Sequence, residues 1–346
     1  MTDSRFIRVL VVDDSAMARR WIIEALSRDP FIEVVGVAAD PYEARDQIPT
    51  LKPDVITLDL EMPRMDGLSF LKILMVHYPI PVVVVSSLSP EGSALALAAL
   101  AGGAVEVMGK PTTRTSSSEA AAQLTRHVRA AAMSKRLETK STQSPLFKRE
   151  NPVNAALGSV IVMGASTGGV EALRYILPRL PEGLPPILVA QHIPAGFSRS
   201  MAKSLNEACA FPVREAEHNE EITGNVCLIA PGDYHLSLTP THPGYKTRLT
   251  QSPRVHHCRP AVDILFRSVA ENVGRKALGV LLTGMGVDGA RGLLSLQASG
   301  AHTIAQNEES CVVFGMPQAA IRLGAAEQIV ALADMPQAIT RAISKG

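Results

Sequence analysis

The chain has 346 residues and is 46% hydrophobic but only 4% aromatic, so it is long enough for two domains, whose cores are expected to be aliphatic. Lys and Arg number 34 against 33 Asp and Glu, a balance that provides no global field for nucleic acid or for an anionic membrane surface. Nucleic-acid binding is therefore disfavoured from the start.

The cysteines and the N-terminal residues point to the same compartment. The chain has four scattered cysteines without a C-x-x-C pair, as expected in a reducing compartment without structural zinc: Cys209, Cys227, Cys258 and Cys311. An apolar run at residues 6–12 is interrupted by Arg8 and is too short for a signal peptide or a membrane span. These features predict a cytoplasmic protein with no direct membrane insertion.

Short β-branched runs alternate with helical patterns through the first 111 residues. The predicted strands are 9–12, 33–38, 55–58, 82–85 and 105–108, and the predicted helices are 16–27, 41–51, 68–77 and 94–100. Continuous apolar strands separated by helices predict a parallel sheet covered on both faces. Five strands in a domain of this size fit the flavodoxin-like doubly wound order, whose ligands bind at the carboxyl ends of the strands.

A polar segment separates this domain from the rest of the chain. Residues 119–137 still have a helical pattern, and from 112 to about 154 the composition is rich in Ser, Thr, Lys, Arg and Gln. We therefore predict a last helix of the first domain followed by a flexible linker. The predicted boundaries are 5–125 for the first domain, 126–155 for the linker with the end of that helix, and 156–344 for the second domain.

The second half begins a new series of strands and helices. The predicted strands are 160–163, 187–191, 226–230, 277–283 and 303–305, and the predicted helices are 170–180, 198–208, 262–272 and 289–299. Periods near 3.6 alternate with short apolar runs, which predicts a second doubly wound, mostly parallel α/β domain.

Acidic residues follow two strands of the first domain. Asp13 and Asp14 come directly after the first strand and Asp59 after the third, so all three are expected at one carboxyl edge of the sheet. Ser86 and Lys110 end the fourth and fifth strands. Converging carboxylates are tolerated around a hard divalent cation, and a hydroxyl and an ammonium beside them would neutralise a phosphoryl group transferred to Asp59. The alternative, that each acid is a solvated helix cap, is disfavoured because the five residues lie at successive strand ends.

These residues resemble the response-regulator receiver domain, through V-D-D-S at 12–15, D-L-E-M-P-x-M-D-G at 59–67, the strand-end Ser86 and K-P at 110–111. The resemblance implies that a histidine kinase phosphorylates Asp59, that Ser86 contacts the phosphoryl group and that Lys110 pairs with it. It also implies a Mg²⁺ ion held by Asp13, Asp14, Asp59 and the carbonyl of Glu61. One position departs from the pattern, since Val107 stands where many receivers have an aromatic side chain.

The second domain opens with an apolar strand that runs into the G-x-S-x-G of residues 164–168. Such a turn exposes the hydroxyl of Ser166 and lets the following backbone N–H groups, beginning with Thr167, face a developing oxyanion. A pyrophosphate cradle is the competing interpretation. It requires an acidic residue at the end of the next strand, but that strand ends in Gln191-His192, so we favour a nucleophilic serine.

Two further residues complete a candidate triad. His192 ends the strand expected beside the serine strand and can act as general base. Asp288 lies in the glycine-rich turn after the strand 277–283, where it can orient the imidazole, and the N–H of Met285 can help to form the oxyanion hole. The alternative role of Asp288 is to cap the helix 289–299, and the two roles can coexist. A triad that uses His302 is weaker, because this residue precedes its strand and lies away from the carboxyl edge.

The segment His256-His257-Cys258 also contains metal-ligand residue types. Adjacent histidines on a strand would point in different directions, and no other cluster completes a tetrahedral set. We therefore expect no metal site there.

Together these residues resemble the catalytic domain of the chemotaxis protein-glutamate methylesterase. The matching motifs are G-A-S-T-G-G at 164–169, Q-H-I-P-A-G-F-S-R-S at 191–200, I-A-P-G-D-Y-H at 229–235, R-P-A-V-D-I-L-F-R-S-V-A at 259–270, L-T-G-M-G-x-D-G at 282–289 and G-M-P at 315–317. The resemblance implies hydrolysis of γ-methyl glutamate esters on chemoreceptors, deamidation of receptor glutamines, and an unphosphorylated receiver that covers the active site. Ester hydrolysis would need no cofactor.

Two other functional classes remain as alternatives. A non-enzymatic adaptor that only binds receptors would not need the serine, histidine and aspartate. A DNA-binding response regulator is disfavoured by the balanced charge and by an output region too large for one helix-turn-helix module.

Overall fold

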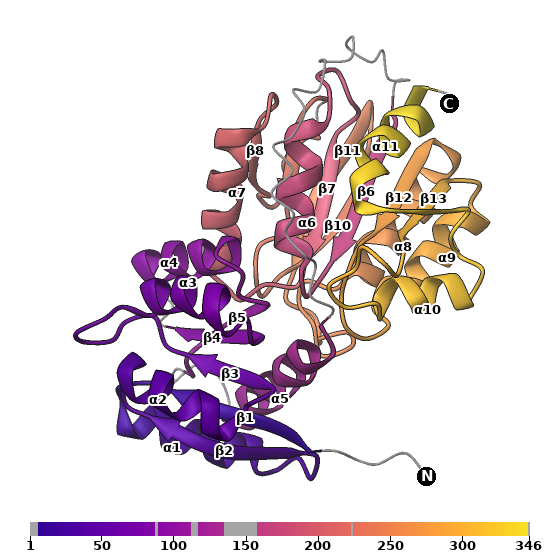
Figure 1. Cartoon of the computed structure of the whole chain (residues 1–346). Helices are drawn as coiled ribbons and strands as arrows, with labels where there is room; N and C mark the ends of the chain where they lie inside the picture. Colours follow the sequence, from indigo (N-terminus) through magenta and orange to yellow (C-terminus); the bar gives the residue numbers. More distant parts are fainter. Residues whose placement is uncertain (1–5, 87–88, 112–116, 135–157, 223, 345–346) are drawn as a thin grey trace. The chain divides into compact units, whose positions relative to one another are not determined.

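The computed structural model describes residues 6–86, 89–111, 117–134, 158–222 and 224–344 (Figure 1). The chain divides into two compact units, 1–134 and 135–346, each of which is described by itself. In the part of the chain that the structure describes, no helix is long and apolar enough to cross a membrane.

The first unit is a five-stranded parallel sheet in the order β2-β1-β3-β4-β5. Its strands are β1 Ile7–Val12, β2 Ile32–Ala38, β3 Val55–Leu58, β4 Val82–Ser86 and β5 Glu106–Gly109, and its helices are α1 Ala16–Leu26, α2 Pro41–Leu51, α3 Gly67–His77, α4 Pro90–Ala101 and α5 Ser117–Met133. This order confirms the predicted flavodoxin-like fold. Because Val12 pairs with Leu58, β1 and β3 end level with each other and their following residues meet at one edge.

The helix predicted for 119–137 ends earlier than expected. In the structure α5 ends at Met133, and residues 135–137 lie outside the described part of the chain. Leu124 and Val128 of α5 pack with Ile22 and Leu26 of α1 and with strand residues in one aliphatic cluster. The predicted linker falls largely on residues that are not described.

The second unit contains a seven-stranded parallel sheet in the order β14-β13-β12-β6-β7-β9-β8, which confirms the predicted second α/β domain. Its strands are β6 Val160–Ala165, β7 Ile187–Gln191, β8 Val213–Glu215, β9 Cys227–Ile229, β12 Ala277–Leu281, β13 His302–Gln306 and β14 Gln328–Val330. Its α-helices are α6 Gly169–Ile176, α7 Phe197–Ala208, α8 Val262–Asn272, α9 Ala290–Ala298, α10 Met316–Arg322 and α11 Met335–Ser344. Val262, Phe266 and Leu293 belong to its buried aliphatic core.

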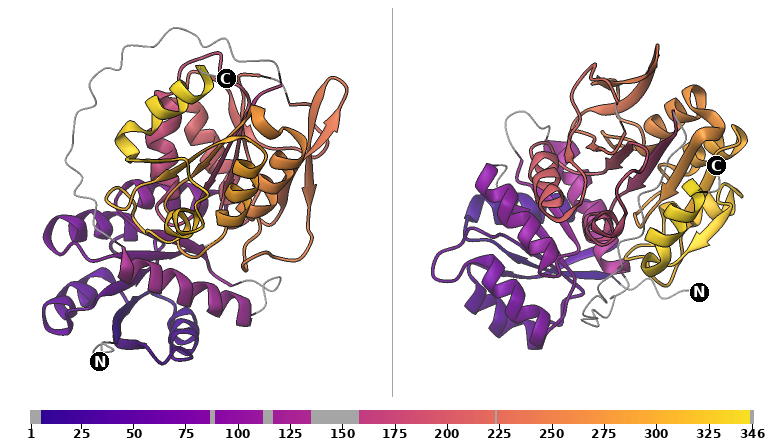
Figure 2. Two further views of the ribbon diagram at one scale, coloured as in Figure 1. Left: turned by 90° about the vertical axis from the view of Figure 1, so that its right-hand side faces the viewer. Right: turned by 90° about the horizontal axis from the view of Figure 1, so that it is seen from above.

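Several elements of this unit were not predicted. An antiparallel hairpin, β10 His235–Thr241 with β11 Gly244–Thr250, stands beside the parallel sheet (Figure 2). The short edge strands β8 and β14 and the helices α10 and α11 were also missed. Many positions of the hairpin are partly exposed, so its sequence lacks the apolar run by which the central strands were recognised.

Candidate functional site

Three neighbouring strands bring the predicted triad to one edge of the second sheet. The strand β6 lies between β7 and β12, with Ala165 level with Gln191 and Gly164 level with Leu281. Ser166 follows β6 directly, and His192 follows β7 directly. The serine and histidine therefore leave adjacent strand ends, as the sequence predicted, because residues in register in a parallel sheet end at the same level.

The turn after β6 is held by hydrogen bonds to its backbone. The N–H of Ser166 donates to the carbonyl of Thr283 (3.0 Å), and Gln191 Nε2 donates to the carbonyl of Ser166 (2.9 Å). Gly168 adopts φ 78°, a left-handed conformation that favours glycine, and α6 begins at the next residue. The chain thus turns sharply at Ser166, whose side chain remains half-buried.

A glycine after β12 lies directly against the serine. A Cβ atom added to Gly284 would be 2.7 Å from Ser166 Cβ and would also overlap Met316 Sδ. The backbone of Gly284 and Met285 can approach the serine this closely because position 284 has no side chain. The predicted oxyanion donors sit on this turn and on the serine turn. Their role remains a prediction, with Met285 half-buried and Thr167 buried.

We expect Gly284→Ala to lower the ester hydrolysis predicted from the sequence by about 100-fold, because a shift of about 1 Å at a reacting group can cost this much. Gly224→Ala is the matched control, since a Cβ at that position meets no atom within 4 Å. Methanol release and thermal unfolding should be measured for both variants. Wild-type rates in a folded Gly284→Ala protein would contradict the close approach to Ser166.

His192 and Asp288 are in direct contact. His192 Nε2 lies 2.7 Å from Asp288 Oδ2, and the two side chains are 14% and 2% exposed. Burial alone would lower the pKa of His192, but the neighbouring Cys258 and Asp288 outweigh it and raise this pKa well above its ordinary value. Burial opposes ionisation of Asp288 too, yet the hydrogen bond and charge of His192 hold the pKa of Asp288 below its ordinary value.

Asp288 does cap a helix, but not the one suggested by its sequence position. Its Oδ2 accepts from the N–H of Val262 (2.7 Å) and its Oδ1 from that of Asp263 (3.0 Å), both in the first turn of α8. The helix after Asp288, α9, has Gly289 at its N-cap without a side-chain hydrogen bond. The alternative in which Asp288 caps the helix 289–299 is therefore not what the structure shows.

His302 lies far from this arrangement in the fold. It is the first residue of β13, at the amino end of the sheet, and its Nδ1 lies 3.1 Å from Glu327 Oε2. The alternative triad with Asp288 is not assembled in this structure.

The segment around Cys258 is a tight turn rather than a strand. Val255 and Cys258 form an isolated antiparallel bridge, and His256 and His257 have φ of 50° and 63°. Cys258 Sγ lies 3.4 Å from His192 Nδ1, a contact that sequence reasoning missed because the two residues are 66 positions apart.

This turn also takes part in a cluster that the sequence did not reveal. His256, Asp263 and Asp288 place potential ligand atoms within 4.8 Å of one another, a set of three that does not amount to the tetrahedral site considered for His256-His257-Cys258. Their atoms already have partners, however. His256 Nε2 lies 3.3 Å from Asp263 Oδ2, and Asp263 Oδ1 accepts from the N–H of Gly292 (2.7 Å).

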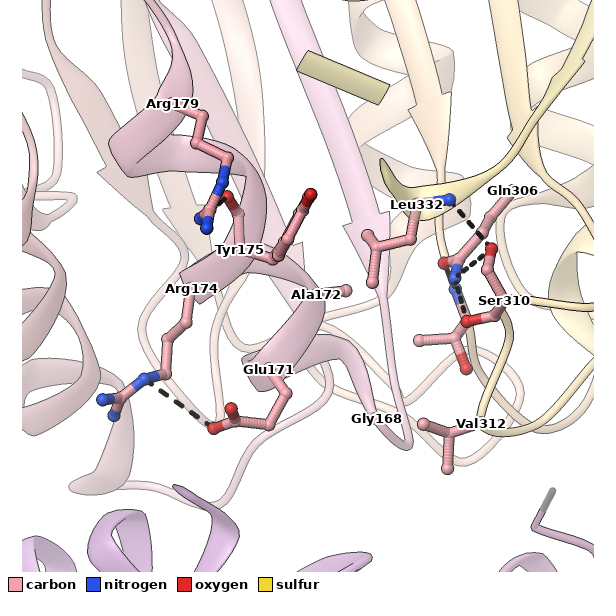
Figure 3. Close-up of a pocket in the computed structure, with 11 residues that line it drawn as sticks. Gly168, Glu171, Ala172, Arg174, Tyr175, Arg179, Gln306, Ser310, Val312 and Leu332 are labelled. Carbon is pink, nitrogen blue, oxygen red and sulfur yellow. Dashed lines mark hydrogen bonds and ion pairs between the residues drawn. The ribbon is translucent and has the colours of Figure 1, made fainter. Parts of the chain in front are cut away.

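A pocket with a volume of about 360 Å³ opens next to the serine turn (Figure 3). Gly168 and Thr283 line it close to Ser166. Arg174 approaches Glu171 (3.7 Å) on the α6 side, and Gln306, Ser310 and Leu332 face them across the pocket. No motif in the sequence indicated it, since its walls come from distant segments.

The first unit gathers the predicted phosphoryl-site residues. Lys110 Nζ lies 2.7 Å from Asp59 Oδ2 and 2.9 Å from Asp13 Oδ2. Asp13, Asp14 and Asp59 place carboxylate oxygens within 4.8 Å of one another, and Asp14 is the exposed member. The hydroxyl of Ser86 is buried at the end of β4 without a hydrogen-bond partner among the described residues, so it is available to a group that enters the site.

The electrostatics of this site suit an added cation. Burial raises the pKa of Asp59, although Lys110 opposes the shift. The N–H groups of Leu60 and Glu61 donate to Asp59 Oδ1 at 2.8 and 3.4 Å, which holds the backbone of Glu61 beside this carboxylate. Three converging carboxylates and one ammonium leave an excess of negative charge, and carboxylate oxygens are the donors that Mg²⁺ prefers. The residues present therefore fit a divalent metal.

Comparison with known proteins matches both units. The family model described as CheB methylesterase matches residues 161–339, and that of the response regulator receiver domain matches residues 9–122. A protein-glutamate methylesterase/protein-glutamine glutaminase from Syntrophus aciditrophicus is 49% identical over 97% of this chain and 99% of its own length. One from Chromohalobacter salexigens is 46% identical over 99% and 97%. The CheB methylesterase catalytic domain of Thermotoga maritima, 38% identical, superimposes with a TM-score of 0.53 over 54% of this chain and 99% of that domain.

Proposed function

Because the chain belongs to the CheB methylesterase family and carries a response regulator receiver domain, we propose that Ser166, His192 and Asp288 hydrolyse receptor glutamyl esters under the control of Asp59. The protein is a hydrolase, a protein-glutamate methylesterase and protein-glutamine glutaminase that acts in chemotaxis. The observation that carries the proposed site is the convergence of β7, β6 and β12, with the 2.7 Å contact between His192 and Asp288.

The proposed catalytic steps start from this contact. Asp288 accepts the Nε2–H of His192, so Nδ1 carries the lone pair that takes the proton of Ser166. The serine oxygen attacks the ester carbonyl, and the N–H groups of Thr167 and Met285 stabilise the oxyanion. The imidazolium returns the proton to the leaving methoxide, and methanol departs. Water then attacks the acyl-enzyme with His192 as base, and glutamate is released. A glutamine side chain would lose ammonia by the same steps.

We place the regulatory reaction at Asp59. A histidine kinase would donate the phosphoryl group, with Ser86 and Lys110 contacting its oxygens. Asp13, Asp14, Asp59 and the carbonyl of Glu61 would hold Mg²⁺, which supplies charge neutralisation for phosphoryl transfer. This assignment is supported by the close approach of the three carboxylates and by the buried, unpartnered hydroxyl of Ser86 within the described chain.

The proposed partners define where the protein acts. Its substrates would be methyl-accepting chemoreceptors, at glutamyl side chains exposed to the cytoplasm, and its phosphodonor would be the chemotaxis histidine kinase. A cytoplasmic location agrees with the four free cysteines. We propose neither a nucleic-acid partner nor membrane insertion.

Control by the receiver predicts opposite behaviour for two variants. A fragment that begins at residue 154 should release methanol from receptor membranes without a phosphodonor, because it lacks the receiver, which we propose inhibits the full-length protein through its high local concentration on the tether. Full-length Asp59→Asn should stay at the basal rate with a phosphodonor and Mg²⁺. If the fragment releases methanol ten times faster than the unphosphorylated full-length protein, the inhibited and free states differ by about 1.4 kcal/mol in free energy.

Methanol release should be compared for wild type, Asp59→Asn and the fragment, each with and without a small phosphodonor. A fragment no faster than the unphosphorylated full-length protein would exclude inhibition by coverage of the site. Receptor binding without methanol release by any form would instead support the adaptor function.

A further inference from the structure

The two imidazole nitrogens of His192 have different partners. Nε2 lies 2.7 Å from Asp288 Oδ2, and Nδ1 lies 3.4 Å from Cys258 Sγ. Since the carboxylate holds the proton on Nε2, the remaining lone pair of the neutral ring points from Nδ1. The thiol of Cys258 thus contacts Nδ1, the nitrogen that takes the proton of Ser166 in the proposed mechanism.

The single lone pair on Nδ1 can accept a hydrogen bond from Cys258 or from Ser166, but not fully from both at once. In the structure the side chain of His192 bonds to Asp288 and Cys258, and Ser166 is not among its hydrogen-bond partners in the described chain. A thiol also gives up its proton far more readily than a serine hydroxyl. While the S–H of Cys258 donates to Nδ1, this nitrogen cannot take the proton of Ser166.

The thiol has a second acceptor within reach. Cys258 Sγ also lies 3.4 Å from the carbonyl oxygen of His256, in the same tight turn. When the S–H donates to this carbonyl, Nδ1 is free. The thiol of Cys258 can therefore donate either to Nδ1 of His192, which makes this nitrogen unavailable to Ser166, or to the carbonyl of His256, which leaves the nitrogen available.

We propose that Cys258 is a positioning residue that competes with Ser166 for Nδ1 of His192 and thereby restrains the general base of the esterase. The proposal rests on the proposed role of His192. It assigns a function to Cys258, which lies outside the family motifs quoted above.

The other ionisable groups around this pair have partners of their own. His256 faces Asp263, and His235 accepts from the N–H of Ala261 (3.1 Å) while its Nε2 lies 3.2 Å from the carbonyl of Pro253. Beyond them, Asp233 pairs with Arg254 and Arg259. Substitution of Cys258 leaves all of these groups in place.

The other cysteines provide an internal contrast. Burial raises the pKa of Cys209 to about 11 and that of Cys227 well above its ordinary value, and Cys311 is fully buried. Cys258 is the half-buried cysteine that contacts an imidazole. Cys209→Ala is therefore the matched control for Cys258→Ala.

The first test is the pH dependence of kcat/KM for methanol release by the active, phosphorylated full-length protein. The pKa of His192 is raised, so wild-type activity should fall as the pH drops through this raised value and the base becomes protonated. Neither alanine nor serine supplies the sulfur that helps to raise the pKa of His192. In Cys258→Ala and Cys258→Ser the acid limb should therefore move to lower pH, and a move of about one pH unit should raise the rate below the limb about tenfold. Cys209→Ala should keep the wild-type profile.

The second test measures the thiol and does not depend on esterase activity. Iodoacetamide, whose methylene carbon is attacked by a thiolate with loss of iodide, should label Cys258 faster than Cys209 in the folded full-length protein. Replacing His192 with glutamine should slow the labelling of Cys258 and leave that of Cys209 unchanged. Peptide mass spectrometry after timed quenching gives both rates.

The outcomes separate this inference from the proposed function. An acid limb that stays in place in both Cys258 variants, or equal labelling of Cys258 in wild type and His192→Gln, would overturn it. If Cys258→Ala fails to fold, Cys258→Ser and the labelling contrast still decide. If the wild-type protein releases no methanol, the proposed function fails, while the labelling rates still show whether Cys258 and His192 form a pair.

Discussion

Replacing Ser166 with alanine is expected to reduce methanol release by about 10⁴-fold or more, because oxyanion stabilisation and binding alone retain only a small residual rate. The fold should survive the change. The backbone of Ser166 is held by Thr283 and Gln191 through main-chain atoms that alanine keeps, and the side chain is only half-buried. Activity should be measured on receptor membranes and stability by thermal unfolding.

Ser295→Ala is a suitable control for the loss of a hydroxyl. Ser295 Oγ donates to the carbonyl of Arg291 within its own helix, away from the triad. Ser295→Ala should keep wild-type activity, and its change in stability should be comparable to that of Ser166→Ala. Wild-type turnover by Ser166→Ala would remove the serine from the mechanism, and a failure to fold would show that the hydroxyl has a structural role.

The sequence contained enough information to place the serine and the histidine together. Continuous apolar runs identified β6 and β7, and residues that follow parallel strands meet at one sheet edge. The same reasoning placed Asp13, Asp59 and Lys110 together in the receiver. These predictions succeeded because they depend only on strand order and direction, which the alternation of strands and helices largely determines.

The contacts made by loops could not be predicted in this way. Cys258 reaches His192 because a tight turn places it there, and Asp288 caps α8 rather than the helix that follows it. Both contacts join residues at least 25 positions apart through irregular backbone. The β10–β11 hairpin escaped prediction for a related reason, since its partly exposed strands show no continuous apolar run.

The cap that Asp288 makes on α8 means that Asp288→Asn should affect stability as well as catalysis. The two carboxylate oxygens of Asp288 together accept from His192 Nε2 and from the N–H groups of Val262, Asp263 and Gly289. An asparagine has one oxygen, so its NH₂ group must face two of these donors whichever way the amide is turned. We expect a loss of stability of about 1–3 kcal/mol from the unsatisfied N–H groups. Catalysis should fall much further, by about 10⁴-fold, because an amide does not stabilise the imidazolium or fix the Nδ1 lone pair.

Asp263→Asn separates these two effects. Asp263 is equally buried, and its Oδ1 accepts from the N–H of Gly292 (2.7 Å), but it does not bond to His192. The control should therefore lose comparable stability and keep most of its activity. Thermal unfolding, methanol release and the ¹⁵N chemical shifts of the His192 ring should be compared for both variants. If the loss of activity matches the loss of stability in the same way in Asp288→Asn and Asp263→Asn, capping explains the whole effect of Asp288. If only Asp288→Asn loses activity and its ring shifts show the proton moved to Nδ1, the carboxylate acts by fixing the tautomer of the base.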